Sequence, residues 1–242
     1  PGANAQDLIV QLDASGNASI TGEQANNGSA GACGVASYSV SPSSFDCDDI
    51  GENAATLTVT DANSNYSTAS FTVTVQDNVA PIVNTNNLTV QLDASGNGSI
   101  TAGQANNSSS DNCSIASMAL SQTDFDCNDV GDQTVNLTVT DVNGNTSTAA
   151  LTVTVQDNVA PVAIAQDLTV QLDASGNGSI TGTQANNGST DNCGIASYAV
   201  DKTDYTCSDV GTPSTVTLTV TDDNGNTSTA SFTVTVQDNI AP

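Results

Sequence analysis

Oxygen-bearing side chains recur at alternate positions of three short loops, a spacing that suits the chemistry of a hard cation. The loops are DANSN at 61–65, DVNGN at 141–145 and DDNGN at 222–226. Aspartate and asparagine oxygens at every second position of a loop can be directed at one ion. The same residues suit a tight hairpin turn, because Asn and Gly adopt the positive φ that its tip requires. Taken alone, the loops therefore favour turn chemistry over metal binding.

The chain lacks most of the side chains that enzymes commonly use for catalysis. The sequence contains no His and a single basic residue, Lys202. The commonest general base and the cationic stabilisers of a reaction are therefore missing. The carboxylates lie in turns that recur along the chain, and no copy of these turns is distinctive. We therefore predict that the protein is not an enzyme and assign no catalytic residue.

The charge balance limits the partners. A formal net charge of −25 gives a surface that cannot neutralise phosphate, which argues against nucleic acid and against insertion into an anionic membrane. Cations are the natural counterpart of such a surface. An acidic composition is also typical of disordered chains. However, apolar residues alternate in LTVQL at 88–92 and LTVTVQD at 151–157, which is the pattern of half-buried strands.

Internal repetition decides the domain organisation. The string QLDASGN occurs at 11–17, 91–97 and 171–177, so its three copies are evenly spaced along the chain. We predict three domains, which we call repeats 1, 2 and 3 and which comprise residues 1–80, 81–160 and 161–242. The third ends on the first residues of a further repeat, so the chain is expected to be part of a longer array.

Six cysteines fall two to a repeat, and the spacing within each pair is the same in all three repeats. They are Cys33 and Cys47, Cys113 and Cys127, and Cys193 and Cys207. Pairing inside each repeat is the simplest arrangement, and it predicts the disulfides 33–47, 113–127 and 193–207. A zinc site is disfavoured, because the chain lacks His and each repeat offers only two thiols. Disulfides imply an oxidising, extracellular setting.

Short apolar alternations predict the strands of each repeat. In repeat 2, a strand at 88–92 is expected to return through the DASGN turn to a strand near residue 100, which makes a hairpin. A strand at 115–120 is expected to turn into a short strand that ends at Cys127, and the cysteine pair would bridge this second hairpin. No segment shows a helical period. The predicted fold class is all-β: tandem immunoglobulin-like β-sandwich repeats in three copies.

The second half of each repeat resembles a known extracellular module. Residues 125–162, FDCNDVGDQTVNLTVTDVNGNTSTAALTVTVQDNVAPV, are similar to the hyalin-repeat type of immunoglobulin-like repeat. That family occurs in animal extracellular proteins and in long bacterial surface adhesins. The resemblance implies an adhesive or spacer role in a secreted or surface-anchored protein, and it supplies no catalytic residue.

Each repeat ends in the motif Q-D-N-(V/I)-A-P, which resembles the cadherin linker, whose Asp-Asn pair holds calcium between successive domains. In a sandwich, the loop before the strand at 115–120 and the last hairpin turn both lie at the end that faces the preceding repeat. Carboxylates gathered there without a cation would repel one another. The expected ligands at the first junction are Asp77, Asn78, Asp111, Asn112, Asp141, Asn143 and Asn145. Those at the second are Asp157, Asn158, Asp191, Asn192, Asp222, Asn224 and Asn226.

Repeat 1 departs from this pattern, because Gly31 and Ala32 stand where the other repeats have Asp and Asn. We therefore expect no calcium site at its start. Calcium is the expected cofactor at the two junctions, since hard oxygen ligands without His select it over transition metals.

The sequence thus predicts a structural or adhesive segment of a secreted bacterial surface protein or extracellular filament. The expected partners are the neighbouring repeats and, in a filament, identical subunits. The alternative is a module that binds a glycan or a receptor. This alternative is disfavoured, because the chain has no Trp, four Tyr and four Phe, and exposed aromatic rings are what sugars stack on.

Overall fold

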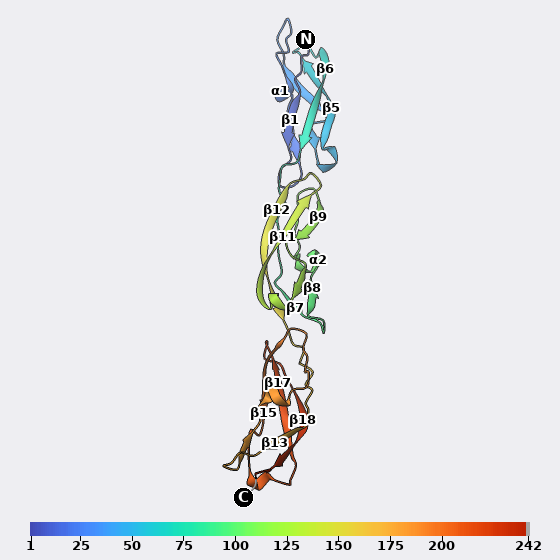
Figure 1. The fold of residues 1–242 in the computed structure, drawn as a ribbon. Coiled ribbons are helices and arrows are strands. Elements are labelled where there is room, and N and C mark those ends of the chain that lie inside the picture. The colour runs from blue at the N-terminus through green and yellow to red at the C-terminus, as the bar shows by residue number, and fades with distance from the viewer. Residues whose placement is uncertain (241–242) are drawn as a thin grey trace. The chain divides into compact units, whose positions relative to one another are not determined.

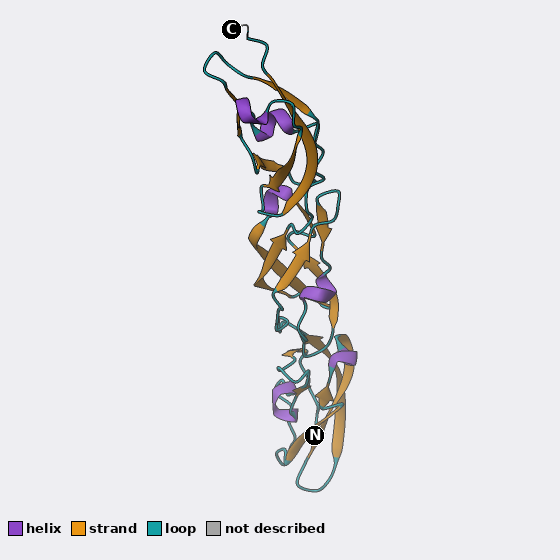
Figure 2. Ribbon diagram, turned by 90° about the horizontal axis from the view of Figure 1, so that it is seen from below, coloured by secondary structure: helices purple, strands orange, loops and turns teal. Residues whose placement is uncertain are grey.

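The computed structural model describes residues 1–240, which are built mostly of β-strands (Figure 1, Figure 2). The chain divides into two compact units. Unit 1 comprises residues 1–86, 101–121 and 135–151, and unit 2 comprises residues 87–100, 122–134 and the described residues from 152 on. The division runs through sequence repeat 2, so unit 1 contains all of repeat 1 and unit 2 contains the described part of repeat 3.

Repeat 1 shows the arrangement of strands in unit 1. Its elements are β1 (Leu8–Gln11), β2 (Ala18–Ser19), α1 (Gly22–Ala25), β3 (Ser37–Ser41), β4 (Ser44–Phe45), the 3₁₀ turn η1 (Cys47–Asp49), β5 (Gly51–Thr60) and β6 (Tyr66–Gln76). One sheet has the order β1-β6-β5-β3, with β1 parallel to β6 and the other neighbours antiparallel. A second, smaller sheet pairs β2 with β4.

Repeat 3 has the same arrangement in unit 2. Its elements are β13 (Leu168–Gln171), β14 (Asn177–Ser179), α3 (Gly182–Ala185), β15 (Ile195–Val200), β16 (Asp204–Thr206), η3 (Cys207–Asp209), β17 (Ser214–Asp222) and β18 (Thr227–Gln237). The larger sheet has the order β13-β18-β17-β15, and the smaller one pairs β14 with β16.

The elements of repeat 2 are divided between the units. They are β7 (Leu88–Gln91), β8 (Asn97–Ser99), α2 (Ala102–Ala105), β9 (Ile115–Leu120), β10 (Asp124–Asp126), η2 (Cys127–Asp129), β11 (Gly131–Asp141) and β12 (Thr146–Gln156). In unit 1, β9 runs antiparallel to the end of β11. In unit 2, β7 runs parallel to the end of β12, and β8 pairs with β10.

Alternation along the long strands makes the core. In repeat 1, Leu57 and Val59 of β5 and Val73 and Val75 of β6 are buried, and they pack with Phe45 of the smaller sheet. Repeat 3 has an equivalent cluster around Tyr205. Burying such side chains between two sheets is what stabilises a sandwich. The fold is therefore all-β, a tandem series of immunoglobulin-like β-sandwich repeats, as the alternation predicts.

The last predicted hairpin is confirmed, since β5 pairs with β6 and β17 with β18 in antiparallel fashion, but the other two predicted hairpins are wrong. The DASGN segment does turn the chain, with Asp93 Oδ1 accepting hydrogen bonds from the backbone N–H groups of Ser95 (2.8 Å) and Asn97 (3.1 Å). The strands on either side of it, however, join different sheets: β7 pairs with β12, and β8 pairs with β10. Likewise β9 pairs with β11 and not with β10. In both places the chain crosses from one sheet to the other between the two strands, because each sheet must cover one face of the core.

Three one-turn helices, α1 to α3, fall where no helix is predicted (Figure 2). Each begins with a capping box. In α1, Thr21 Oγ1 accepts from the N–H of Gln24 (3.3 Å) and Gln24 Oε1 accepts from the N–H of Thr21 (2.7 Å). A single turn is too short to show a helical period, but the T-x-x-Q spacing is a helix-start signal. No helix within residues 1–240 is long and apolar enough to cross a membrane.

Replacing Tyr205 with Phe is expected to stabilise the protein. Tyr205 is 1% exposed, and its hydroxyl has no hydrogen-bond partner among residues 1–240. Burial also raises the pKa of this hydroxyl. Repeats 1 and 2 carry buried Phe45 and Phe125 at the equivalent position.

An unpaired buried hydroxyl costs about 1–3 kcal/mol, so Y205F should raise the free energy of unfolding of unit 2 by about 1 kcal/mol or more in urea titrations. The reciprocal change, F45Y, should lower that of unit 1. A loss of stability in Y205F would show that the hydroxyl is paired.

Candidate metal centres at the repeat junctions

The linker aspartates are positioned by the strands that precede them. In β6, Phe71, Val73 and Val75 face the core, and Asp77 follows in the same phase. The alternation that buries the apolar residues therefore turns the Asp77 carboxylate inward, and this residue is 5% exposed. Asp157 follows β12 in the same way and is also 5% exposed.

The hairpin aspartates follow the same rule. Asp141 ends β11 in phase with Val135, Leu137 and Val139, and it is 2% exposed. Its Oδ1 accepts from the backbone N–H groups of Asn143 and Asn145, both at 2.8 Å, so it also forms the turn. Asp222 ends β17 and does the same in unit 2, where it is 1% exposed.

Turn chemistry accounts for part of this arrangement. Asp61 of repeat 1 makes the same bonds to the N–H groups of Asn63 and Asn65, both at 2.9 Å. The hydrogen bonds from Asn65 and the turn backbone lower the pKa of Asp61. Since Gly31 and Ala32 replace the Asp-Asn pair in repeat 1, these bonds form without the carboxylate that Asp111 supplies in repeat 2. The turn interpretation is therefore right for the loops, but it does not account for the groups that meet them.

A loop of repeat 2 places a third carboxylate, that of Asp111, near Asp77 and Asp141. Asp111 Oδ2 accepts from the N–H of Cys113 at 3.0 Å. Asn112 Nδ2 donates to Asp77 Oδ1 (3.1 Å) and to the carbonyl of Asp13 in the DASGN turn (3.2 Å). Asn145 Nδ2 donates to the Asp77 carbonyl at 3.1 Å. Three segments of unit 1 are thus tied to one linker.

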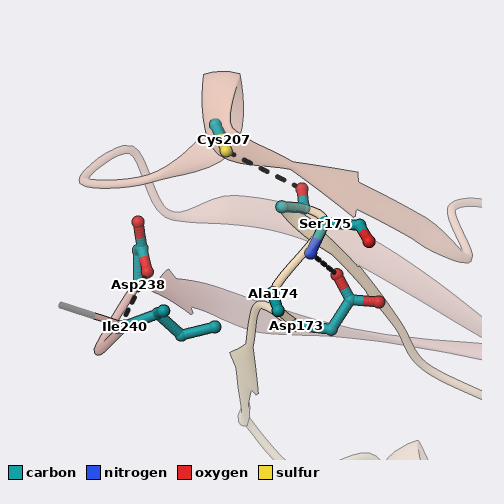
Figure 3. A pocket seen from close by; sticks show the side chains of 7 residues that line it. Asp173, Ala174, Ser175, Cys207, Asp238 and Ile240 are labelled. Atoms are coloured by element: carbon teal, nitrogen blue, oxygen red, sulfur yellow. Dashed lines mark hydrogen bonds between the residues drawn. The ribbon is translucent and has the colours of Figure 1, made fainter. Parts of the chain in front are cut away.

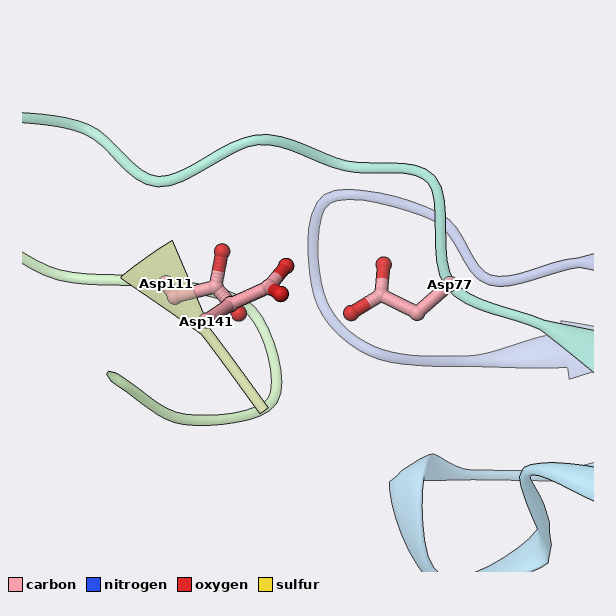
Figure 4. A group of neighbouring side chains, drawn as sticks. All are labelled: Asp77, Asp111 and Asp141. Atoms are coloured by element: carbon pink, nitrogen blue, oxygen red, sulfur yellow. The ribbon is translucent and has the colours of Figure 1, made fainter. Parts of the chain in front are cut away.

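The first cluster consists of Asp77, Asp111 and Asp141, each of which offers an oxygen within 4.8 Å of the others. Figure 4 shows the Asp77 carboxylate reaching from the linker toward the other two. Asp77 Oδ2, Asp111 Oδ1 and Asn112 Oδ1 are buried and accept no hydrogen bond from the described chain. An ion bound at about 2.3–2.6 Å can join oxygens separated by twice that length. The spacing therefore fits calcium.

The second cluster repeats this geometry in unit 2. Asp157, Asp191 and Asp222 again offer oxygens within 4.8 Å of one another. Asn192 Nδ2 donates to Asp157 Oδ1 and to the Asp93 carbonyl, both at 3.1 Å. Asp157 Oδ2, Asp191 Oδ1 and Asn192 Oδ1 are buried without a partner in the part of the chain that the structure describes. Two independent copies thus leave the same three oxygens unpaired.

Four of the predicted ligands are not brought into the clusters. Asn78 and Asn158 are exposed, and their side-chain amides donate to Gln11 (2.6 Å) and Gln91 (2.5 Å). Asn143 and Asn224 are exposed at the tips of their turns. Asn145 and Asn226 reach the linker, but as hydrogen-bond donors to the carbonyls of Asp77 and Asp157.

The DASGN turn is a part of the junction that the sequence interpretation missed. Gly16 approaches the loop of repeat 2 so closely that a Cβ there would lie 2.9 Å from the Asn112 carbonyl oxygen, and its φ is +75°. Only glycine tolerates both conditions. The signal available in the sequence is the identity of QLDASGN in all three repeats, which is more than a solvated turn requires.

No side chain of the protein can neutralise either cluster. The one basic residue, Lys202, pairs with Asp209 at 2.7 Å. Each cluster therefore holds three carboxylates, two of them almost wholly buried, without a cationic side chain. Burial of an unpaired carboxylate costs several kcal/mol, so the arrangement favours a bound cation.

The predicted disulfides are wrong in their pairing. In the structure, a disulfide joins Cys47 to Cys113 in unit 1 and another joins Cys127 to Cys193 in unit 2, both with a sequence separation of 66. Cys33 and Cys207 are exposed and form no disulfide within residues 1–240. Each bond therefore links two repeats and does not close a hairpin inside one.

Strand direction explains this correction. Because β1 is parallel to β6, the DASGN turn after β1 lies at the same end of repeat 1 as the linker after β6. Cys47 Sγ lies at this end, 3.9 Å from the Gly16 carbonyl oxygen. The loop that holds Cys33 lies at the opposite end, where Gly2 bridges Ala30. The segment between Cys33 and Cys47 thus carries the chain from one end to the other.

Disulfide and acidic cluster are parts of one junction. Cys113 follows Asp111 and Asn112 directly, and Cys47 Sγ lies 3.6 Å from the Asn112 carbonyl oxygen. In unit 2, Cys127 Sγ lies 3.4 Å from the Asn192 carbonyl oxygen. The bond therefore holds the loop that carries the third carboxylate against the preceding repeat.

Solved structures similar to this chain include extracellular cadherin domains. Domains 1–4 of protocadherin gamma B7 match with 13% identity over 97% of this chain and 75% of that one, at a TM-score of 0.35. Mouse cadherin-23 domains EC22–24 match with 14% identity over 97% and 96%, at a TM-score of 0.38. Similarities at these TM-scores do not identify the ligands or partners of this chain. No protein-family model and no curated protein sequence matches the chain.

Proposed function

We propose that this chain is a structural and adhesive segment of a secreted bacterial surface protein or extracellular filament, stiffened at its junctions by calcium. Its domains are repeats 1 to 3 with the bounds given above. The observation that carries this proposal is the repeated set of buried, unpaired oxygens, Asp77 Oδ2, Asp111 Oδ1 and Asn112 Oδ1 and their counterparts in unit 2.

Calcium chemistry suits each junction. The three carboxylates supply a formal charge of −3, and the Asn112 or Asn192 oxygen adds a neutral ligand, with water free to complete the six to eight oxygens that calcium takes. Bound calcium replaces the repulsion among carboxylates by attraction to one centre. The linker, the preceding turn and the following loop are then held together, so the linker stops acting as a hinge.

The disulfides support the same role. A bond between successive repeats resists their separation, and disulfides persist in oxidising compartments, which agrees with an extracellular location. The resemblance to hyalin repeats in the second half of each repeat favours a surface adhesin.

Small-angle X-ray scattering tests the stiffening. Adding a chelator to the protein in millimolar calcium is expected to broaden the distribution of interatomic distances, and the double variant D77N/D157N should give the broad profile even with calcium. D238N is the matched control, because Asp238 makes the same turn bond to Ile240 N–H (3.0 Å) but is exposed at the end of repeat 3. Identical profiles with and without chelator would contradict calcium-dependent stiffening.

A further inference from the structure

Each disulfide lies directly beside the acidic cluster of its unit. Cys113 follows Asp111 and Asn112 in the chain, and its backbone N–H donates to Asp111 Oδ2 at 3.0 Å. In unit 2, the backbone N–H of Cys193 donates to Asp191 Oδ2 at 2.8 Å. One half of each bond is therefore attached to the loop that supplies a carboxylate and an unpaired asparagine oxygen to the cluster.

The other half of each bond is positioned by its own repeat. Cys47 Sγ lies 3.9 Å from the Gly16 carbonyl oxygen. Cys207, which forms no disulfide within residues 1–240, lies 3.8 Å from the equivalent oxygen of Gly176, and Figure 3 shows it against this turn. The cysteine of the 3₁₀ turn thus takes its position without a bond. What the disulfide fixes in unit 1 is therefore the loop before β9.

The carboxylates that this loop helps to gather repel one another. Asp77 lies on the linker and is 5% exposed, whereas Asp111 and Asp141 belong to repeat 2. The side-chain amides of Asn112 and Asn145 each donate a hydrogen bond to Asp77 at 3.1 Å. Such hydrogen bonds exchange with water, whereas a disulfide is covalent. In the absence of an ion, the disulfide therefore holds the loop beside the linker against the repulsion of the carboxylates.

We propose that each disulfide sets the calcium affinity of the cluster beside it, so that a junction binds calcium tightly only after its bond has formed. This inference rests on the proposed function, because it concerns the same two clusters. With the bond in place, the loop already lies beside the linker, and calcium does not have to bring the carboxylates together. With the bond reduced, the carboxylates move apart, and part of the binding free energy of calcium is used to gather them again.

Calcium binding and disulfide reduction are then linked equilibria. A dithiol such as dithiothreitol reduces the bond between Cys47 and Cys113: the disulfide gains two electrons and two protons to give two thiols, and the dithiol is oxidised to its cyclic disulfide. The factor by which the bond raises the calcium affinity equals the factor by which bound calcium raises the stability of the bond against reduction. Because disulfides form in oxidising compartments, the junctions stiffen only there.

Calorimetric titration of C47S/C113S with calcium tests the effect of the bond on the ion. The two clusters belong to different units, so the second cluster is an internal control. We expect one site with the dissociation constant of the unmodified protein and one site that is about tenfold weaker or more, within the range usual for coupled equilibria. C33S/C207S is the matched control: it removes two exposed cysteines but neither disulfide, and it should leave both constants unchanged.

Reduction of the unmodified protein tests the reverse effect and does not depend on the folding of a cysteine variant. The protein is equilibrated with mixtures of reduced and oxidised dithiothreitol, in saturating calcium or in chelator, and the free thiols are alkylated and identified by mass spectrometry. Calcium should raise the ratio of reduced to oxidised dithiothreitol that is needed for half-reduction by the same factor as the affinity. D77N should abolish this protection for the 47–113 bond and retain it for the 127–193 bond.

The outcomes separate this inference from the proposed function. If the oxidised protein binds no calcium, both are overturned. If the oxidised protein binds calcium, but C47S/C113S keeps two sites with unchanged dissociation constants, only the coupling is overturned. A weaker site in C47S/C113S without any effect of calcium on reduction would show that the variant is misfolded, and this result would also overturn the coupling.

Discussion

Removing the disulfide between Cys47 and Cys113 is expected to lower the free energy of unfolding of unit 1 by about 4 kcal/mol, the value that the chain-entropy model gives for a closed loop of this length. The bond has a sequence separation of 66, which is far more than a hairpin staple would close. C127S/C193S should have a similar effect on unit 2, because its bond has the same separation. Urea unfolding of C47S/C113S and of C127S/C193S measures both effects.

The exposed cysteines supply the control. C33S/C207S should unfold like the unmodified protein, because neither residue forms a disulfide within residues 1–240. Digestion at aspartates without reduction, followed by mass spectrometry, should recover 47–113 and 127–193. Recovery of 33–47 and 193–207, with destabilisation of C33S/C207S, would contradict the junction described here.

Cysteine spacing could not decide this pairing. In a chain whose repeats recur at even intervals, a constant spacing inside each repeat requires an equally constant spacing to the next one. Both pairings therefore produce the same regular pattern in the sequence. Strand direction decides between the two pairings. Because β3 and β4 belong to different sheets, they carry the chain from Cys33 to the far end of the repeat, where Cys47 lies. Alternation predicts which residues are buried but not which strands pair.

The same alternation separates the right ligands from the wrong ones. Asp77 and Asp141 continue the inward phase of β6 and β11, so their orientation follows from residues two and four positions earlier. Their burial also needs the adjoining repeat, because Asp238 has the same phase after β18 and is exposed. Asn78 is one position out of phase and is exposed. The linker motif alone could not make this distinction. The place of Asp111 depends on contact between two repeats, which no local pattern encodes.

Calcium is expected to stabilise each junction. Neutralising one carboxylate should therefore lower the free energy of unfolding when calcium is present, but not when calcium is removed. Calcium at 100 times its dissociation constant adds about 2.7 kcal/mol to the folded state. D77N should therefore destabilise unit 1 when calcium is present, because the variant no longer binds the ion well. With chelator, the free energy of unfolding of the same variant should equal or exceed that of the unmodified protein, because the substitution removes one of three mutually repelling carboxylates.

Thermal and urea unfolding with and without calcium measure this reversal. D157N should show it in unit 2, and D238N, whose carboxylate is exposed, should show none. Asparagine preserves the size of the side chain and an oxygen that can accept from the Val79 N–H, so folding of the variant is retained. If D77N were destabilising to the same extent under both conditions, the cluster would be structural and not a metal site.

A calorimetric titration of the chelator-treated protein with calcium tests the central claim most directly, since it counts the ions. We predict two sites, one for each cluster, with dissociation constants of about 10⁻⁴–10⁻³ M, the range of extracellular calcium modules. D77N and D157N should each retain one site, their combination none, and D238N both. The absence of binding heat at millimolar calcium, or two sites retained in D77N/D157N, would contradict the account.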